Sequence, residues 1–141
     1  MAGFYRRAEQ LNYDGSYKAG EELANGVFVS ITANGVKKLT AAGTTEFRVK
    51  EKTTLWGLPA VVLVCTKDGG VEFLVENEFE DYGCGDINYA EYTVPAGHYV
   101  KMRRPNINDE IIVSVTSTVL GTLAIDDTVT PASGGSLVKK S

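Results

Sequence analysis

Hydrophobic and polar residues alternate along much of this chain with a period of about two, the pattern of β-strands whose two faces meet different environments. The alternation is clearest over 46–52, where Phe47 and Val49 fall on one face and charged residues on the other. Residues 60–66 are instead a continuous apolar run rich in β-branched residues, which predicts a central strand covered on both faces. No long stretch has the period of about 3.6 that marks an amphipathic helix, so helices are expected only as short turns near 8–11 or 86–91.

Glycine, proline, asparagine and aspartate gather between the apolar segments and divide them into short strands. Three of these turns predict hairpins: 33–35, from which 36–39 pairs back on 27–31; 67–70, from which 71–75 returns; and 95–97, which joins 92–94 to 98–102. Strands that recur every ~8–12 residues are typical of sandwiches and barrels. The sequence therefore predicts an all-β fold, a single-domain β-barrel or β-sandwich. Further strands are expected at 27–31, 36–39, 110–116, 119–125, 128–130 and 136–138.

The first 24 residues differ from the rest because they show no sustained alternation. They are nevertheless rich in aromatic residues and arginine, the residue types that anchor protein interfaces. We therefore predict an extended, interface-forming N-terminal arm over 1–24, followed by a β-domain over 25–141. A frayed terminus, or a tail folded back on its own core, is the alternative. The expected arm anchors are Phe4, Tyr5, Arg6, Arg7, Tyr13 and Tyr17.

Composition narrows the possible functions. With 43% hydrophobic residues among 141, the chain is long enough to bury a core without a metal or a disulfide. Its formal net charge of −4 argues against general nucleic-acid binding, which needs a basic surface to displace counterions from phosphates. The longest apolar run, 58–65, is far too short to span a membrane, and the N-terminus lacks the apolar core of a secretory signal. Synthesis in a cytoplasm is therefore expected, and pairing of Cys65 with Cys84 stays open.

No arrangement of catalytic or cofactor-binding residues is recognisable. The single histidine, His98, follows a turn, and the chain has no P-loop, GxGxxG, GxSxG or CxxC pattern. We therefore expect a protein that is not an enzyme and needs no cofactor. The acidic segment 76–81 has three interpretations: a solvated rim strand, one side of a salt bridge between subunits, or a calcium site. A basic cluster, Lys101 with Arg103 and Arg104, suits pairing with carboxylates of another protein.

Three segments, 47–60, 73–77 and 95–105, resemble small structural proteins of tailed bacteriophages, in character the head decoration (cement) proteins. The resemblance implies a β-rich, non-enzymatic domain that binds the outer face of an icosahedral shell, commonly as a trimer. The implied partner is the major capsid protein, with neither nucleic acid nor membrane involved. The implied location is the capsid surface of a virion assembled in the host cytoplasm. On this hypothesis Arg103 and Arg104 join the arm residues as interface anchors.

Two other functions fit the same residues. Another virion component, from the tail, neck or fibre base, would share the β-rich, oligomeric character. A carbohydrate- or ligand-binding β module is the second, with Trp56, Tyr82 and Tyr89 as a stacking platform. The aromatic residues are scattered along the chain, and Trp56 leads into an apolar strand, so a core role for Trp56 is favoured over a sugar platform.

Overall fold

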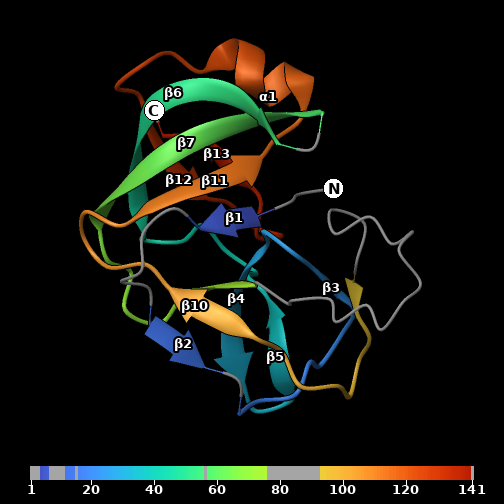
Figure 1. Ribbon diagram of the computed structural model, residues 1–141. Helices are drawn as coiled ribbons and strands as arrows, with labels where there is room; N and C mark the ends of the chain where they lie inside the picture. The colour runs from blue at the N-terminus through green and yellow to red at the C-terminus, as the bar shows by residue number, and fades with distance from the viewer. Residues whose placement is uncertain (1–3, 7–11, 15, 56, 76–92, 141) are drawn as a thin grey trace.

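The computed structural model of the protein describes residues 4–6, 12–14, 16–55, 57–75 and 93–140. These residues form three antiparallel sheets and one short helix, arranged as a sandwich-like all-β domain (Figure 1). The predicted fold class is confirmed, and of its two forms the sandwich is the one observed, since the sheets of the described residues stay open.

The larger sheet, sheet A, has six strands. In spatial order they are β1 (Phe4–Arg6), β11 (Glu110–Ser114), β7 (Leu58–Lys67), β6 (Glu46–Leu55), β12 (Thr128–Pro131) and β13 (Leu137–Lys139). β7 lies inside the sheet and buries Ala60 and Val62 on one face and Val61 and Leu63 on the other, as its continuous apolar run predicts. A register shift between β6 and β7 marks a β-bulge, and the long β6 curves over the sheet (Figure 1).

The second sheet, sheet B, has five strands. Their order is β2 (Asn12–Asp14), β10 (Met102–Arg104), β8 (Phe73–Val75), β4 (Phe28–Thr32) and β5 (Gly35–Lys38), and a third, small sheet pairs β3 (Leu23–Ala24) with β9 (Thr93–Val94). The turn from β4 to β5 is the one predicted at 33–35. Gly35 has φ +100 there, and a Cβ would meet the backbone of Lys18 and Gly20 at 2.8 Å, so only glycine fits.

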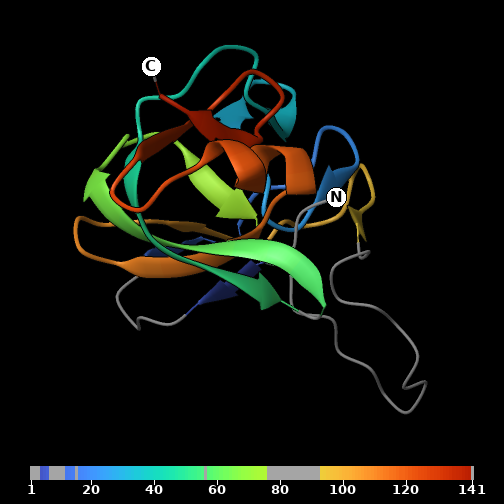
Figure 2. The same cartoon turned by 90° about the horizontal axis from the view of Figure 1, so that it is seen from above.

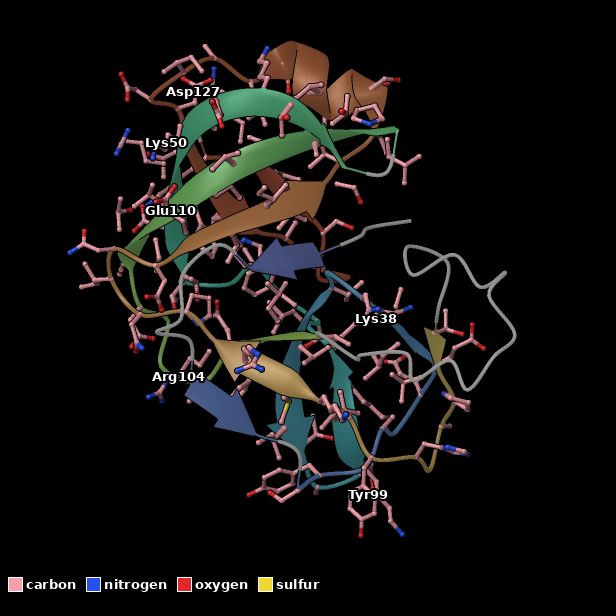
Figure 3. The ribbon with its side chains drawn as sticks, viewed as in Figure 1. Lys38, Lys50, Tyr99, Arg104, Glu110 and Asp127 are labelled. Carbon is pink, nitrogen blue, oxygen red and sulfur yellow. The ribbon has the colours of Figure 1, made fainter. Side chains whose placement is uncertain are left out.

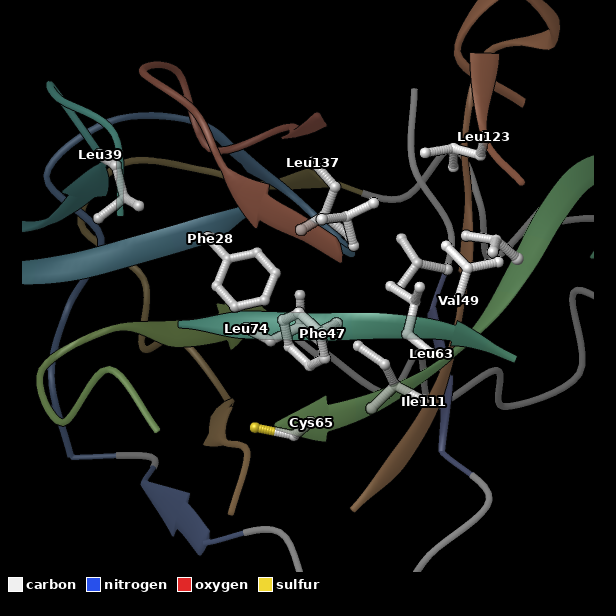
Figure 4. Packing of buried hydrophobic residues seen from close by; sticks show 13 residues of the cluster. Phe28, Leu39, Phe47, Val49, Leu63, Cys65, Leu74, Ile111, Leu123 and Leu137 are labelled. Atoms are coloured by element: carbon white, nitrogen blue, oxygen red, sulfur yellow. The ribbon is translucent and has the colours of Figure 1, made fainter. Parts of the chain in front are cut away.

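Two hydrophobic clusters cover the two faces of sheet B. Between the large sheets, Phe28 of β4 meets Phe47 of β6 edge to face, with ring centroids 5.7 Å apart (Figure 4). On the opposite face, Val29 and Val75 pack in a second cluster with Leu23 of β3. Because β4 and β8 are buried on both faces, apolar residues stand at consecutive positions in both strands.

Helix α1 (Ser117–Thr122) lies where the sequence predicts a strand over 119–125, so that prediction is wrong. The side-chain oxygen of Thr116 accepts a hydrogen bond from the Val119 amide at 3.2 Å and caps the helix directly after β11. Val119 and Leu120 still pack against the cluster between the sheets, and α1 lies beside β13 (Figure 2). The apolar residues reach the core from a helix instead of a strand.

The hairpin predicted at 33–35 is confirmed, whereas those predicted at 67–70 and 95–97 have the expected turn but the wrong strand pairing. After the turn at 67–70, β8 joins sheet B instead of returning to β7, because β6 and β11 already occupy both edges of β7. After the turn at 95–97, where the His98 amide donates to the Pro95 carbonyl at 3.2 Å, β9 does not pair with the segment that follows. Residues 17–24 take that place: β3 pairs with β9, and the Ala19 amide donates to the His98 carbonyl at 2.8 Å.

The first 24 residues pair with the domain's own sheets wherever the structure describes them. β1 forms three register pairs with β11, β2 forms three with β10, and β3 pairs with β9. Of the alternatives open for this segment, the pairing agrees with a tail folded back on its own domain. Whether its side chains also contact a partner stays a prediction.

Candidate functional site

One edge of sheet B brings together two groups of predicted interface residues that are far apart in the sequence. The register of β2 on β10 places Tyr13 opposite Arg103 and Asn12 opposite Arg104. The pairing continues beyond β2, because the Val100 amide donates to the Tyr17 carbonyl at 2.9 Å and the backbones of Lys18 and Tyr99 form an isolated antiparallel β-bridge. The aromatic N-terminal segment and the basic cluster thus share one edge.

Both arginines of the basic cluster also have partners within the chain. The Arg104 guanidinium donates through Nη1 to the Gly70 carbonyl at 3.0 Å, which ties β10 to the turn after β7. Its Nε is buried without a hydrogen-bond partner, and Arg103 is half-buried with a partner inside the chain. These contacts give the two arginines a structural part besides the predicted pairing with another protein.

The end of sheet B that lies away from sheet A carries exposed aromatic residues. Tyr17 is 43% exposed and Tyr99 61% exposed. The Lys18 ammonium lies 5.4 Å from the centroid of the Tyr99 ring, within the range of a cation–π contact. Figure 3 shows Tyr99 projecting from this end of the domain.

The open edge of sheet A carries the remaining predicted residues that the structure describes. The register places Phe4 opposite Val113, Tyr5 opposite Ile112 and Arg6 opposite Ile111.

A pocket of about 320 Å³ lies where the small β3–β9 sheet meets the ends of β11 and β13. Its polar lining includes Glu22, Lys38, Ser114 and Ser136, and Lys38 lies between sheet A and β3 (Figure 3). The lining therefore offers one acid, one base and several hydroxyl groups to a small polar ligand. Its apolar residues are Ala24, Val27, Val113, Val115, Val119 and Leu137.

Charges are distributed unevenly between the two sheets. Among the described residues, sheet A and its connections hold five ion pairs, for example Lys50 with Glu110 at 3.0 Å. A hydrogen bond from Lys140 at 2.8 Å lowers the pKa of Glu46. Lys37 of β5 and Lys18, which lies beside sheet B, have no ion pair with any residue that the structure describes. At the same strand, β5, Glu21 brings in a carboxylate, whose Oε2 accepts a hydrogen bond from the Lys38 amide at 2.8 Å.

Buried polar groups in the described residues serve the fold. Glu72 is 5% exposed and accepts four hydrogen bonds from the amides and hydroxyls of Thr44 and Thr45, at 2.7–3.0 Å. Burial alone would raise the pKa of Glu72, but these hydrogen bonds outweigh it and hold the pKa below its ordinary value. Cys65 is fully buried, as its apolar run predicts, and burial raises the pKa of its thiol to about 11. Among the described residues, no three acidic, histidine or cysteine side chains lie close enough to hold a metal ion.

Several predicted features lie outside the described residues: Arg7, the acidic segment 76–81, Trp56, Tyr82, Tyr89, Cys84 and the helical turns at 8–11 and 86–91. Lys18 and Tyr99 were missed as candidate interface residues. A period of two read outward from the buried Val100 and Met102 puts Tyr99 on the opposite face, so the signal was present in the sequence.

Comparison of the chain with protein-family models, curated proteins and solved structures gives no match. Within the part of the chain that the structure describes, no helix has the length and apolar character to cross a membrane.

Proposed function

We propose that this protein is a virion structural protein that binds the outer surface of a bacteriophage capsid and stabilises it as a decoration protein. One observation carries the proposal: the aromatic- and arginine-rich N-terminal segment supplies an edge strand to each large sheet, β1 to sheet A and β2 to sheet B. Both edges lie on the same side of the domain (Figures 1 and 2).

Such a side is suited to contact with another protein. The outer backbone groups of an edge strand are a template for a further strand, and aromatic residues and arginine are enriched at the centres of interfaces. Six predicted anchors fall on these strands or opposite them: Phe4, Tyr5, Arg6, Tyr13, Arg103 and Arg104. Compact β structure with aromatic edges supports a protein that acts by binding.

Binding at the seams between capsomers explains how a small domain stabilises a large shell. A protein that binds only the assembled shell adds its binding free energy to the stability of that shell. A trimer would engage three capsid subunits at once, so weak contacts at each would combine into high avidity. The partner proposed is the major capsid protein, and the location is the capsid surface of the virion.

A tail, neck or fibre-base component remains the alternative within the virion. A ligand-binding module is a second candidate, which the pocket of about 320 Å³ favours because it is large enough for a small polar molecule.

Light scattering followed by co-sedimentation with purified empty capsids tests the proposal. Binding that saturates at a fixed number of copies per capsid supports a decoration protein, and the mass in solution gives the oligomeric state. A folded protein that stays in the supernatant at all capsid concentrations overturns the proposal. Point variants suit this test better than deletion of residues 1–20, because deletion also removes β1 and β2 from their sheets.

A further inference from the structure

Four exposed residues lie at the same end of sheet B, and we call them together the tip surface: Tyr17, Lys18, Ile31 and Tyr99. The Lys18 ammonium lies over the Tyr99 ring, and Tyr17 and Ile31 are joined to this pair through the backbone. We propose that the tip surface docks on an acidic patch of a protein partner. The inference rests on the proposed function and names the part of the domain that meets the shell. Of the predicted anchors, this part includes only Tyr17.

Backbone hydrogen bonds hold the four residues together. Tyr17 accepts a bond from the Val100 amide at 2.9 Å, next to Tyr99. The Lys18 carbonyl accepts one from the Val36 amide at 2.9 Å, and Val36 is the register partner of Ile31. Residues 17–18 therefore connect the Tyr99 segment on one side with the β4–β5 hairpin on the other.

The tip surface exposes large apolar and aromatic side chains to solvent, next to fully buried core residues. Tyr17, Ile31 and Tyr99 are 43%, 37% and 61% exposed, while Val36 and Val100 beside them are fully buried. Tyrosine covers much area for the loss of few rotamers, which makes it a frequent energetic centre of interfaces. Because backbone hydrogen bonds between neighbouring segments already fix the main chain here, docking orders little additional chain.

Charge indicates the chemistry of the partner. Lys18 lies over the Tyr99 ring and makes no ion pair with a described residue. Lys37 is close by, since its side chain passes next to Gly20. Glu21 already brings a carboxylate next to Lys37, because its Oε2 accepts a hydrogen bond from the Lys38 amide at 2.8 Å. Most described cations of sheet A are paired internally, so on a protein of net charge −4 the exposed Lys18 beside Tyr99 is a cation available to a partner's carboxylate. Two lysines are too few to displace the counterions that firm binding to nucleic acid requires, so the partner is a protein.

The test uses two tip variants and two matched controls in the capsid co-sedimentation assay. The tip variants are Tyr99→Ala and Lys18→Glu. The controls are Ile125→Ala, at an apolar residue 54% exposed at the sheet A end, and Lys52→Glu, at an exposed lysine of β6. All four sites are on the surface, and urea unfolding verifies that each variant folds as the wild type does.

We expect each tip variant to weaken capsid binding at least about 10-fold, with the controls within about 2-fold of wild type. If the wild type binds capsids and the tip variants bind them equally tightly, docking through the tip surface is overturned, while the proposed function is not. Absence of wild-type binding overturns both. If the tip variants change the mass in solution but not capsid binding, the occupant is a second copy of the chain, and docking on the shell is excluded.

Discussion

The carboxylate of Glu72 joins the two large sheets, so removing its charge should loosen the sandwich. Glu72 directly precedes β8 of sheet B, and its partners Thr44 and Thr45 precede β6 of sheet A. Glu72→Gln keeps the shape of the side chain but replaces one acceptor oxygen by a donor amide. Either the Thr44 or the Thr45 amide then faces another donor.

The size of the effect follows from which amide loses its acceptor. Thr45 is 1% exposed, whereas Thr44 is open to solvent, so the glutamine oxygen should remain with Thr45. The lost bond is then the one from the Thr44 amide, at 2.7 Å in the wild type. A hydrogen bond to a charged group contributes roughly 1.5–3 kcal/mol, and water can replace part of it at Thr44. We expect Glu72→Gln to lower the free energy of unfolding by about 2 kcal/mol.

Urea unfolding of both proteins as a function of pH measures this contribution and its origin. The pKa of Glu72 is lowered in the folded state from its ordinary value of 4.5, so the charged form stabilises the fold above that pH. The difference between wild type and variant should therefore be constant from neutral pH to about pH 5 and shrink as the pH falls further.

Glu110→Gln is the matched control, because Glu110 forms a solvent-exposed ion pair with Lys50 on sheet A. Its removal should change the free energy of unfolding by less than about 1 kcal/mol. Equal effects for the two variants, or a Glu72→Gln effect that does not change with pH, would refute the assigned role of Glu72.

Three further predictions test the fold. Phe47→Ala should cost about 3–5 kcal/mol, because it removes the ring that meets Phe28 between the sheets; a urea-unfolding cost below about 1 kcal/mol contradicts this core. Gly121→Ala should stabilise the protein by about 0.5–1 kcal/mol, because Gly121 lies in helix α1 and a Cβ added to it would have no neighbour within 4 Å outside the helix backbone. A lower melting temperature for this variant would argue against the helix. In a Cys84→Ser background, Cys65 should resist a thiol reagent at pH 8 until urea unfolds the chain, and rapid native labelling contradicts its burial and raised pKa.

The sequence predicts strands best where one residue pattern determines both faces. The alternation at Phe47 and Val49 and the apolar run of β7 were sufficient, because each pattern records directly which faces are buried. Strand pairing was harder to predict. Nothing local to 71–75 shows that both edges of β7 are already occupied, so the predicted hairpin was wrong although its turn was right.

Local sequence patterns were also insufficient for helix α1 and for the edge of sheet B formed by β2 and β10. The apolar residues Val119 and Leu120 suit a strand or a helix, and the Thr116 cap decides for the helix. Tyr13 and Arg103 were each predicted as anchors, but only the β2–β10 register places them opposite one another. Residues that come together through long-range pairing leave no local pattern.

The central claim is that the protein stabilises a capsid by binding its outer surface, and the temperature at which empty capsids rupture tests it most directly. Rupture is followed by dye uptake or light scattering, with and without saturating protein. The account predicts a higher rupture temperature with the wild type and a smaller increase with Tyr99→Ala at the same concentration. Capsids that rupture at the same temperature with every binding site occupied would contradict a decoration role.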